Sequence, residues 1–153
     1  MIESVMQIAG GVPLTRLLPR VGPKDAALRQ ARTCYDHLAG ALGVGIADAL
    51  RANGLVEIAG DAASLTETGH VQMQALGILA PDGNSRSNRP VCRPCLDWSE
   101  RRPHLAGVLG AAICTHALEK GWVRRRLGTR ALEITPAGRI GFRHAFGVES
   151  AAS

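Results

Sequence analysis

Apolar residues recur every three to four positions over two stretches, residues 36–53 and 104–120, and this spacing predicts an amphipathic helix in each. Gly54 and Gly121 follow the two stretches, as is typical where a helix ends in a left-handed residue. Two short strand-like segments come next, and a threonine then begins another apolar stretch. The pattern therefore predicts the order helix, hairpin, helix twice in succession.

The hairpins and closing helices can be bounded from their turn and cap residues. In the first copy, strands at 55–58 and 63–66 flank a Gly-Asp turn, and Thr66 or Thr68 begins a helix that ends near residue 76. In the second copy, strands at 122–126 and 130–134 precede Thr135-Pro136, a strong helix start. The closing helix carries Ile140, Phe142 and Phe146.

The two copies are related in sequence. The heptapeptide that begins at His37 returns at His104, displaced by 67 positions, and nine of the twenty residues from 37 to 56 are identical at that displacement. Leu65–Gly69 then resembles Ile134–Gly138 at a displacement of 69. Two copies are too few for a solenoid, so the repeat indicates a duplicated small domain.

Three glycines lie within the first predicted helix, at positions 40, 43 and 45, and each costs about 1 kcal/mol there relative to alanine. Either a tight turn or the close approach of another backbone would explain them. Upstream, we expect a helix at 2–9, and a second helix from Ala26, capped by Asp25, with Leu28, Ala31 and Tyr35 facing the core.

The predicted fold class is α+β, mainly helical. The order helix, glycine, strand, basic turn, strand and capped helix is that of the helix-and-wing half of a winged-helix domain, so two tandem winged-helix-like repeats are expected. The predicted organisation is an N-terminal helix and Pro/Gly linker at 1–24, repeats at 25–79 and 104–147, a linker at 80–103, and a tail at 148–153.

Charge distinguishes the two halves of this chain of 153 residues. Residues 1–83 hold six Lys/Arg and eight Asp/Glu, whereas residues 84–153 hold twelve and five, a net charge of +7. Such asymmetry suggests a polyanionic partner for the second half. No apolar run reaches the roughly 18 residues of a membrane helix, and no signal segment opens the chain, so we expect a cytoplasmic protein without membrane contact.

Four arginines, Arg124, Arg125, Arg126 and Arg130, fall on the second predicted hairpin. A hairpin of this kind can lie along the phosphate backbone of double-stranded DNA or enter a minor groove. The alternative is a solvated edge that charge protects from aggregation.

The four cysteines, Cys34, Cys92, Cys95 and Cys114, are candidates for metal binding or redox sensing. Cys92 and Cys95 have the spacing of half a zinc ribbon, and Cys34, Cys114, His37 and His104 are the residues able to complete it. The alternative is that they are ordinary reduced thiols, as is usual in the cytosol, and that the protein has no cofactor. No catalytic motif is present, so we expect no enzyme activity.

Two segments carry a resemblance to a known family. Residues 32–40, RTCYDHLAG, and 95–102, CLDWSERR, together with the Ile-Thr-Pro-Ala-Gly motif at 134–138, resemble the C-terminal region of a branch of bacterial ArsR-type helix-turn-helix regulators. The resemblance covers residues 25 to 147 and implies a transcriptional regulator that acts as a homodimer. The first helix resembles the last helix of the family's N-terminal DNA-binding domain, so we expect this chain to lack most of that domain.

The resemblance implies a role in dimerisation, effector response or auxiliary DNA contact. Two alternatives remain at this point: a thiol- or metal-sensing module without DNA binding of its own, and a protein-interaction domain.

Overall fold

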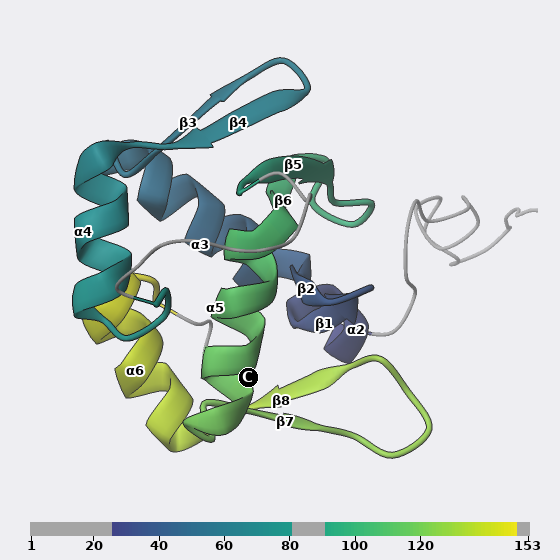
Figure 1. Ribbon diagram of the computed structural model, residues 1–153. Helices are drawn as coiled ribbons and strands as arrows, with labels where there is room; N and C mark the ends of the chain where they lie inside the picture. Colours follow the sequence, from purple (N-terminus) through teal and green to yellow (C-terminus); the bar gives the residue numbers. More distant parts are fainter. Residues whose placement is uncertain (1–25, 81–90, 150–153) are drawn as a thin grey trace, which may run out of the picture.

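The computed structural model describes residues 26–80 and 91–149 (Figure 1). Within these ranges the protein has a mixed α+β fold of short helices and two-stranded hairpins, in agreement with the predicted α+β class. The helix expected at 2–9, the linker at 12–24, the Asp25 cap and most of the loop at 80–90 lie outside the described residues. None of the described helices is long and apolar enough to cross a membrane.

The same six elements occur twice in the same order. After a short helix α2 (Ala26–Gln30), the first copy comprises β1 (Arg32–Cys34), β2 (His37–Ala39), α3 (Gly40–Ala52), β3 (Val56–Ala59), β4 (Ala62–Leu65) and α4 (Glu67–Ala75). The second comprises β5 (Arg93–Leu96), β6 (Pro103–Ala106), α5 (Gly107–Glu119), β7 (Val123–Arg125), β8 (Leu132–Ile134) and α6 (Pro136–Phe146). Four antiparallel hairpins result: β1–β2, β3–β4, β5–β6 and β7–β8.

The predicted order of helix, hairpin and helix is present in both copies, but the predicted starts of the first helices are wrong. Residues 37–39 and 103–106 are strands, paired with β1 and β5 respectively, so α3 and α5 begin only at Gly40 and Gly107. Both glycines have positive φ, 77° and 80°, which L-residues rarely adopt. Each copy therefore opens with a hairpin, and the segment expected to link the copies contains β5.

Tyr35 also departs from expectation. It was predicted to face the core from a helix, but it lies in the β1–β2 turn with φ of 56° and is 89% exposed. In α6, Phe142 and Phe146 are buried as core residues, whereas Ile140 is exposed.

A threonine connects the closing helix of each copy to the chain before it. Thr66 and Thr135 cap α4 and α6 by accepting hydrogen bonds from the amides of Gly69 (3.0 Å) and Gly138 (2.9 Å). The sequence predicted the Thr135 cap and left Thr66 and Thr68 open for α4, and the structure selects Thr66. The same hydroxyls donate to the carbonyls of Gly54 (2.8 Å) and Gly121 (2.6 Å), directly after the preceding helices. In each copy a single threonine side chain therefore joins the start of the closing helix to the end of the preceding helix.

The two copies interlock around a shared core. Helix α3 packs against β6 of the second copy, and α5 packs against β2 of the first (Figure 1). A Cβ atom on Gly43 would overlap the carbonyl of Leu38 and lie 3.3 Å from the Cβ of His104, and Gly110 has the equivalent surroundings in the other copy. Close backbone approach therefore explains Gly43, whereas the positive φ explains Gly40.

The glycine contacts yield a stability prediction. We expect Gly43→Ala to lower the free energy of unfolding by about 1–3 kcal/mol, because its methyl group must displace backbone. Gly45→Ala, in the same helix, is the matched control: its Cβ would lie 3.5 Å from Val148 Cγ1, an ordinary contact, and alanine favours the helix by up to about 1 kcal/mol. Denaturant unfolding of both variants checks the prediction, and equal effects would contradict it.

Candidate functional site

Two cysteines and two histidines from the opening hairpins form one cluster. Cys34 faces His37 across the β1–β2 pair, and Cys95 faces His104 across the β5–β6 pair. One ligand atom from each of the four residues lies within 4.8 Å of all the others. The histidines are buried and the cysteines half-buried, so the cluster sits at the edge of the core between the two copies.

The cluster is part of the repeat, although the sequence comparison did not reveal it. Arg-x-Cys-x-Asp occurs at residues 32–36 and again at 93–97, and His-Leu-Ala-Gly follows in both copies. Asp36 precedes His37 directly, whereas six residues separate Asp97 from His104. This insertion shifts the displacement from 67 to 61, and a gapped comparison of the two copies would have found the motif.

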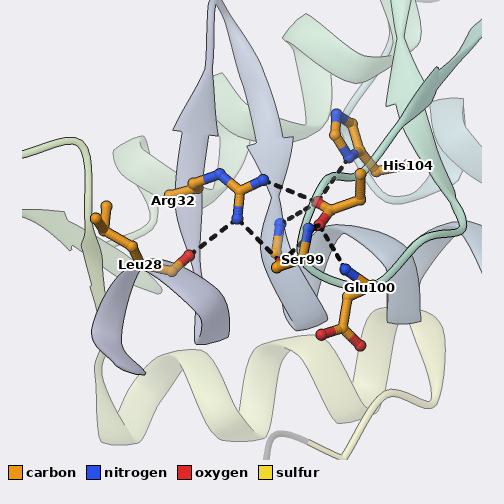
Figure 2. A network of polar contacts seen from close by, with 7 residues as sticks. Leu28, Arg32, Ser99, Glu100 and His104 are labelled. Atoms are coloured by element: carbon orange, nitrogen blue, oxygen red, sulfur yellow. Dashed lines mark hydrogen bonds and ion pairs between the residues drawn. The ribbon is translucent and has the colours of Figure 1, made fainter. Parts of the chain in front are cut away.

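Asp97 is the polar centre beside this cluster. Its buried carboxylate accepts hydrogen bonds from the Gly40 amide (2.6 Å), the Glu100 amide (3.1 Å), and the Ser99 amide (3.0 Å) and hydroxyl (2.7 Å). Arg32 forms an ion pair with it at 3.4 Å. Figure 2 shows these contacts meeting at one carboxylate: the Arg32 side chain comes from the first copy, and Ser99, the Glu100 amide and the His104 ring come from the second.

The ionisation of Asp97 follows from these contacts. Burial alone would raise its pKa, but the hydrogen bonds from Ser99, Gly40 and Glu100 and the charge of Arg32 together hold the pKa well below its usual range. The carboxylate is therefore charged at neutral pH and able to accept a hydrogen bond from a neighbouring imidazole.

Asp97 orients His104. The Nδ1 atom of His104 lies 3.0 Å from Asp97 Oδ2, so Nδ1 carries the proton and Nε2 keeps a lone pair. Nε2 is buried and has no hydrogen-bond partner within the described residues. Burial and the neighbouring His37 lower the pKa of His104 to about 4, although Asp97 opposes this shift, and the imidazole is neutral at pH 7.

The first copy has a looser version of this arrangement. His37 Nδ1 lies 3.3 Å from Asp36 Oδ1, and the rings of His37 and His104 lie 4.8 Å apart between centroids. Each histidine thus has a carboxylate from its own copy beside Nδ1, supplied by the aspartate of the Arg-x-Cys-x-Asp motif.

The four cysteines considered from the sequence divide into two pairs. Cys34 and Cys95 belong to the cluster, and burial together with Cys34 raises the pKa of the Cys95 thiol to about 11. Cys92 and Cys114 lie in the hydrophobic core, outside the cluster, and burial raises the pKa of both thiols, that of Cys92 to about 11. The Cys92-x-x-Cys95 spacing therefore does not bring its two thiols to one site, because Cys92 packs into the core beside β5.

The basic hairpin is a second candidate site. Arg124, Arg125, Arg126 and Arg130 are all exposed on β7 and the following turn, and the β7–β8 hairpin extends from the body of the protein (Figure 1). Arg124 pairs with Glu133 across the hairpin at 3.3 Å, and both side chains are largely exposed. Leu127 at the tip is fully exposed.

Known proteins give one informative comparison. The chain is 39% identical over 141 residues to YdfF of Bacillus subtilis (strain 168), named an uncharacterized HTH-type transcriptional regulator. The match includes 92% of this chain but 61% of the relative, so the chain spans less than two thirds of that protein. No protein-family model and no solved structure matches the chain.

Asp97 yields a prediction about stability. We expect Asp97→Asn to lower the free energy of unfolding by about 3–5 kcal/mol, because an amide cannot accept all these hydrogen bonds and leaves the Arg32 charge buried without its partner. Asp48→Asn is the control, since it removes an exposed ion pair with Arg102 and should cost less than about 1 kcal/mol. Similar losses in the two variants, measured by urea unfolding, would contradict the assigned role of Asp97.

His104 yields a prediction about pH. The pKa of His104 is about 4 in the folded protein, below the usual histidine value of 6.5, so the unfolded chain binds the proton first as the pH falls. Its contribution to stability should be complete above pH 6.5 and decrease as the pH falls towards 4, by up to about 3 kcal/mol at 1.36 kcal/mol per pH unit. Urea unfolding with a chelator present should show that the free energy of unfolding depends less steeply on pH in His104→Gln than in the natural chain. An equal dependence in both proteins would contradict the assigned pKa shift of His104.

Proposed function

We propose that this chain is part of a transcriptional regulator of the ArsR type and that its β7–β8 hairpin binds the phosphate backbone of double-stranded DNA. The identity of 39% to an HTH-type regulator carries the proposal of a regulatory role. The proposed role is non-catalytic, with the two copies acting as winged-helix-like units.

The exposure and the charge of the hairpin support the proposed DNA contact. Arginine side chains on an extended hairpin can reach several phosphates, and such contacts supply affinity without reading sequence. The Arg124–Glu133 pair is a weak competitor, because exposed pairs contribute at most about 1 kcal/mol.

The corresponding hairpin of the first copy provides an internal contrast. Glu57 stands at the position of Arg124, and the β3–β4 turn contains Asp61 in place of a basic residue. Basic charge is therefore not required for the hairpin to fold, since the same strand pairing forms without it. This favours a binding role for the arginines over a purely structural one.

The proposal extends to assembly. Helix-turn-helix regulators commonly bind two half-sites as dimers, and we propose a homodimer on that ground. An effector response belongs to the same proposal, with the Cys/His cluster as the candidate place for it.

Fluorescence anisotropy with two unrelated duplexes across a salt series tests the DNA contact. We expect binding that weakens with salt, with a log–log slope of about −0.9 per neutralised phosphate, and little preference between the duplexes. Arg124→Ala/Arg125→Ala/Arg126→Ala should reduce the magnitude of the slope by roughly 2 to 3.

A charge-matched control separates the hairpin from net charge. Arg51→Ala/Arg93→Ala/Arg143→Ala removes three exposed arginines from other elements and should leave the slope nearly unchanged. Undetectable binding at low salt, or equal loss in the two triple variants, would rule out the hairpin as the DNA contact.

A further inference from the structure

The Cys/His cluster has the composition and dimensions of a metal centre. Two sulfur and two nitrogen ligands suit a tetrahedral zinc ion, with bonds of about 2.3 Å to sulfur and 2.0–2.1 Å to nitrogen. Ligand atoms around such an ion lie roughly 3.3–3.8 Å apart, as follows from these bond lengths in a tetrahedron. The four ligand atoms here already lie within 4.8 Å of one another, so contraction of about 1 Å would complete the geometry.

The surroundings of the histidines are those of metal ligands. A histidine bound to a metal usually donates its other ring N–H to a carboxylate or carbonyl, which fixes the tautomer. His104 has this arrangement with Asp97 at 3.0 Å, and Asp36 lies 3.3 Å from His37 Nδ1. The buried Nε2 of His104 has no hydrogen-bond partner within residues 26–80 and 91–149, so its lone pair is available to a metal.

The duplication gives an independent argument. The motif Arg-x-Cys-x-Asp, then His-Leu-Ala-Gly, places one cysteine and one histidine as cross-strand partners in each opening hairpin. Neither hairpin alone supplies four ligands. The packing of the two copies against each other assembles the set, with two ligands from each.

We propose that Cys34, His37, Cys95 and His104 bind one zinc ion that joins the two copies of the repeat. On binding, the two thiols release their protons to solvent and coordinate as thiolates, and the two neutral imidazoles coordinate through nitrogen. Two thiolates balance the charge of Zn²⁺, which suits a half-buried position. With four protein ligands the site is closed, so its role is structural or regulatory rather than catalytic.

The ligands of the site are distinct from the residues of the proposed DNA contact, since none of them lies on the basic hairpin. Removing Arg124, Arg125 and Arg126 should therefore leave metal binding intact, and a failure of DNA binding would not affect this proposal.

The first test is metal content of the full chain, purified without chelator and then equilibrated with zinc and desalted. We expect about one zinc per chain in the natural protein. Cys34→Ala and Cys95→Ala should lose stoichiometric zinc. The other two cysteines provide matched controls, because Cys92→Ala and Cys114→Ala remove thiols that lie outside the cluster and should retain the metal.

Cobalt substitution gives a readout that does not depend on the variants folding. Co²⁺ added to the metal-depleted natural chain should produce thiolate-to-cobalt charge transfer and the d–d bands of a tetrahedral centre, both reversed by excess zinc. Absence of these bands, or zinc loss in the Cys92 and Cys114 variants equal to that in the Cys34 and Cys95 variants, would overturn the proposal. A third result would also overturn the proposal. Mass spectrometry without reductant would show a Cys34–Cys95 disulfide, and the same protein would bind no zinc after reduction.

Discussion

The buried carboxylate of Asp97 is the interaction on which the joint between the two copies depends. It accepts a hydrogen bond from the Gly40 amide, at the start of α3 in the first copy. In the second copy it accepts hydrogen bonds from the Ser99 amide and hydroxyl, the Glu100 amide and the Nδ1–H of His104. Arg32 balances its charge from β1. A buried charge is tolerated when hydrogen bonds and an opposite charge both satisfy it, and here the groups that do so come from both copies. The same contact therefore stabilises the packing of the copies and fixes a ring of the Cys/His cluster.

Two glycines permit the close packing of the two segments. Gly43 and Gly110 lie at equivalent positions in α3 and α5. A Cβ atom at either would meet first the carbonyl of the leucine in its own copy's histidine strand, and then the histidine Cβ of the other copy at 3.3 or 3.1 Å. A larger residue at either position would press on the histidine strand of its own copy and on the histidine of the other copy, and would so disturb both halves of the cluster. The His-Leu-Ala-Gly-x-Leu-Gly heptapeptide thus combines three requirements: a histidine for the cluster, a glycine with positive φ to begin the helix, and a glycine for close packing.

Sequence periodicity predicted the elements that are long or capped, and it missed those that are short. Helix–hairpin–helix order, the Thr66 and Thr135 caps and the burial of Phe142 and Phe146 follow from apolar spacing and turn residues. Strands β1 and β2 have three residues each, too few to distinguish from the start of a helix, so His37 was assigned to α3 and Tyr35 to a core face. The Cys/His cluster depends on how two hairpins meet, which spacing along the chain cannot reveal. The sequence paired Cys92 with Cys95 and left Cys34, Cys114, His37 and His104 open as further ligands, whereas strand pairing makes His104 the neighbour of Cys95.

The two segments with the same order of elements are alike in their opening hairpins and differ in their outer hairpins. Both opening hairpins contain a cysteine, an aspartate and a histidine. The cysteines and histidines come together at one cluster, and each aspartate lies beside the Nδ1 atom of its histidine. The outer hairpins differ instead: β3–β4 carries Glu57, and β7–β8 carries arginines on the same fold. The Cys/His cluster and the basic hairpin are connected through β1. The Thr33 amide donates a hydrogen bond to the Arg130 carbonyl (3.0 Å), and the Leu132 amide donates one to the carbonyl of Ala31, directly before β1 (3.0 Å). The strand that ends in Cys34 is thus hydrogen-bonded to the base of the basic hairpin, and the position of that hairpin depends on the strand that supplies a residue to the cluster.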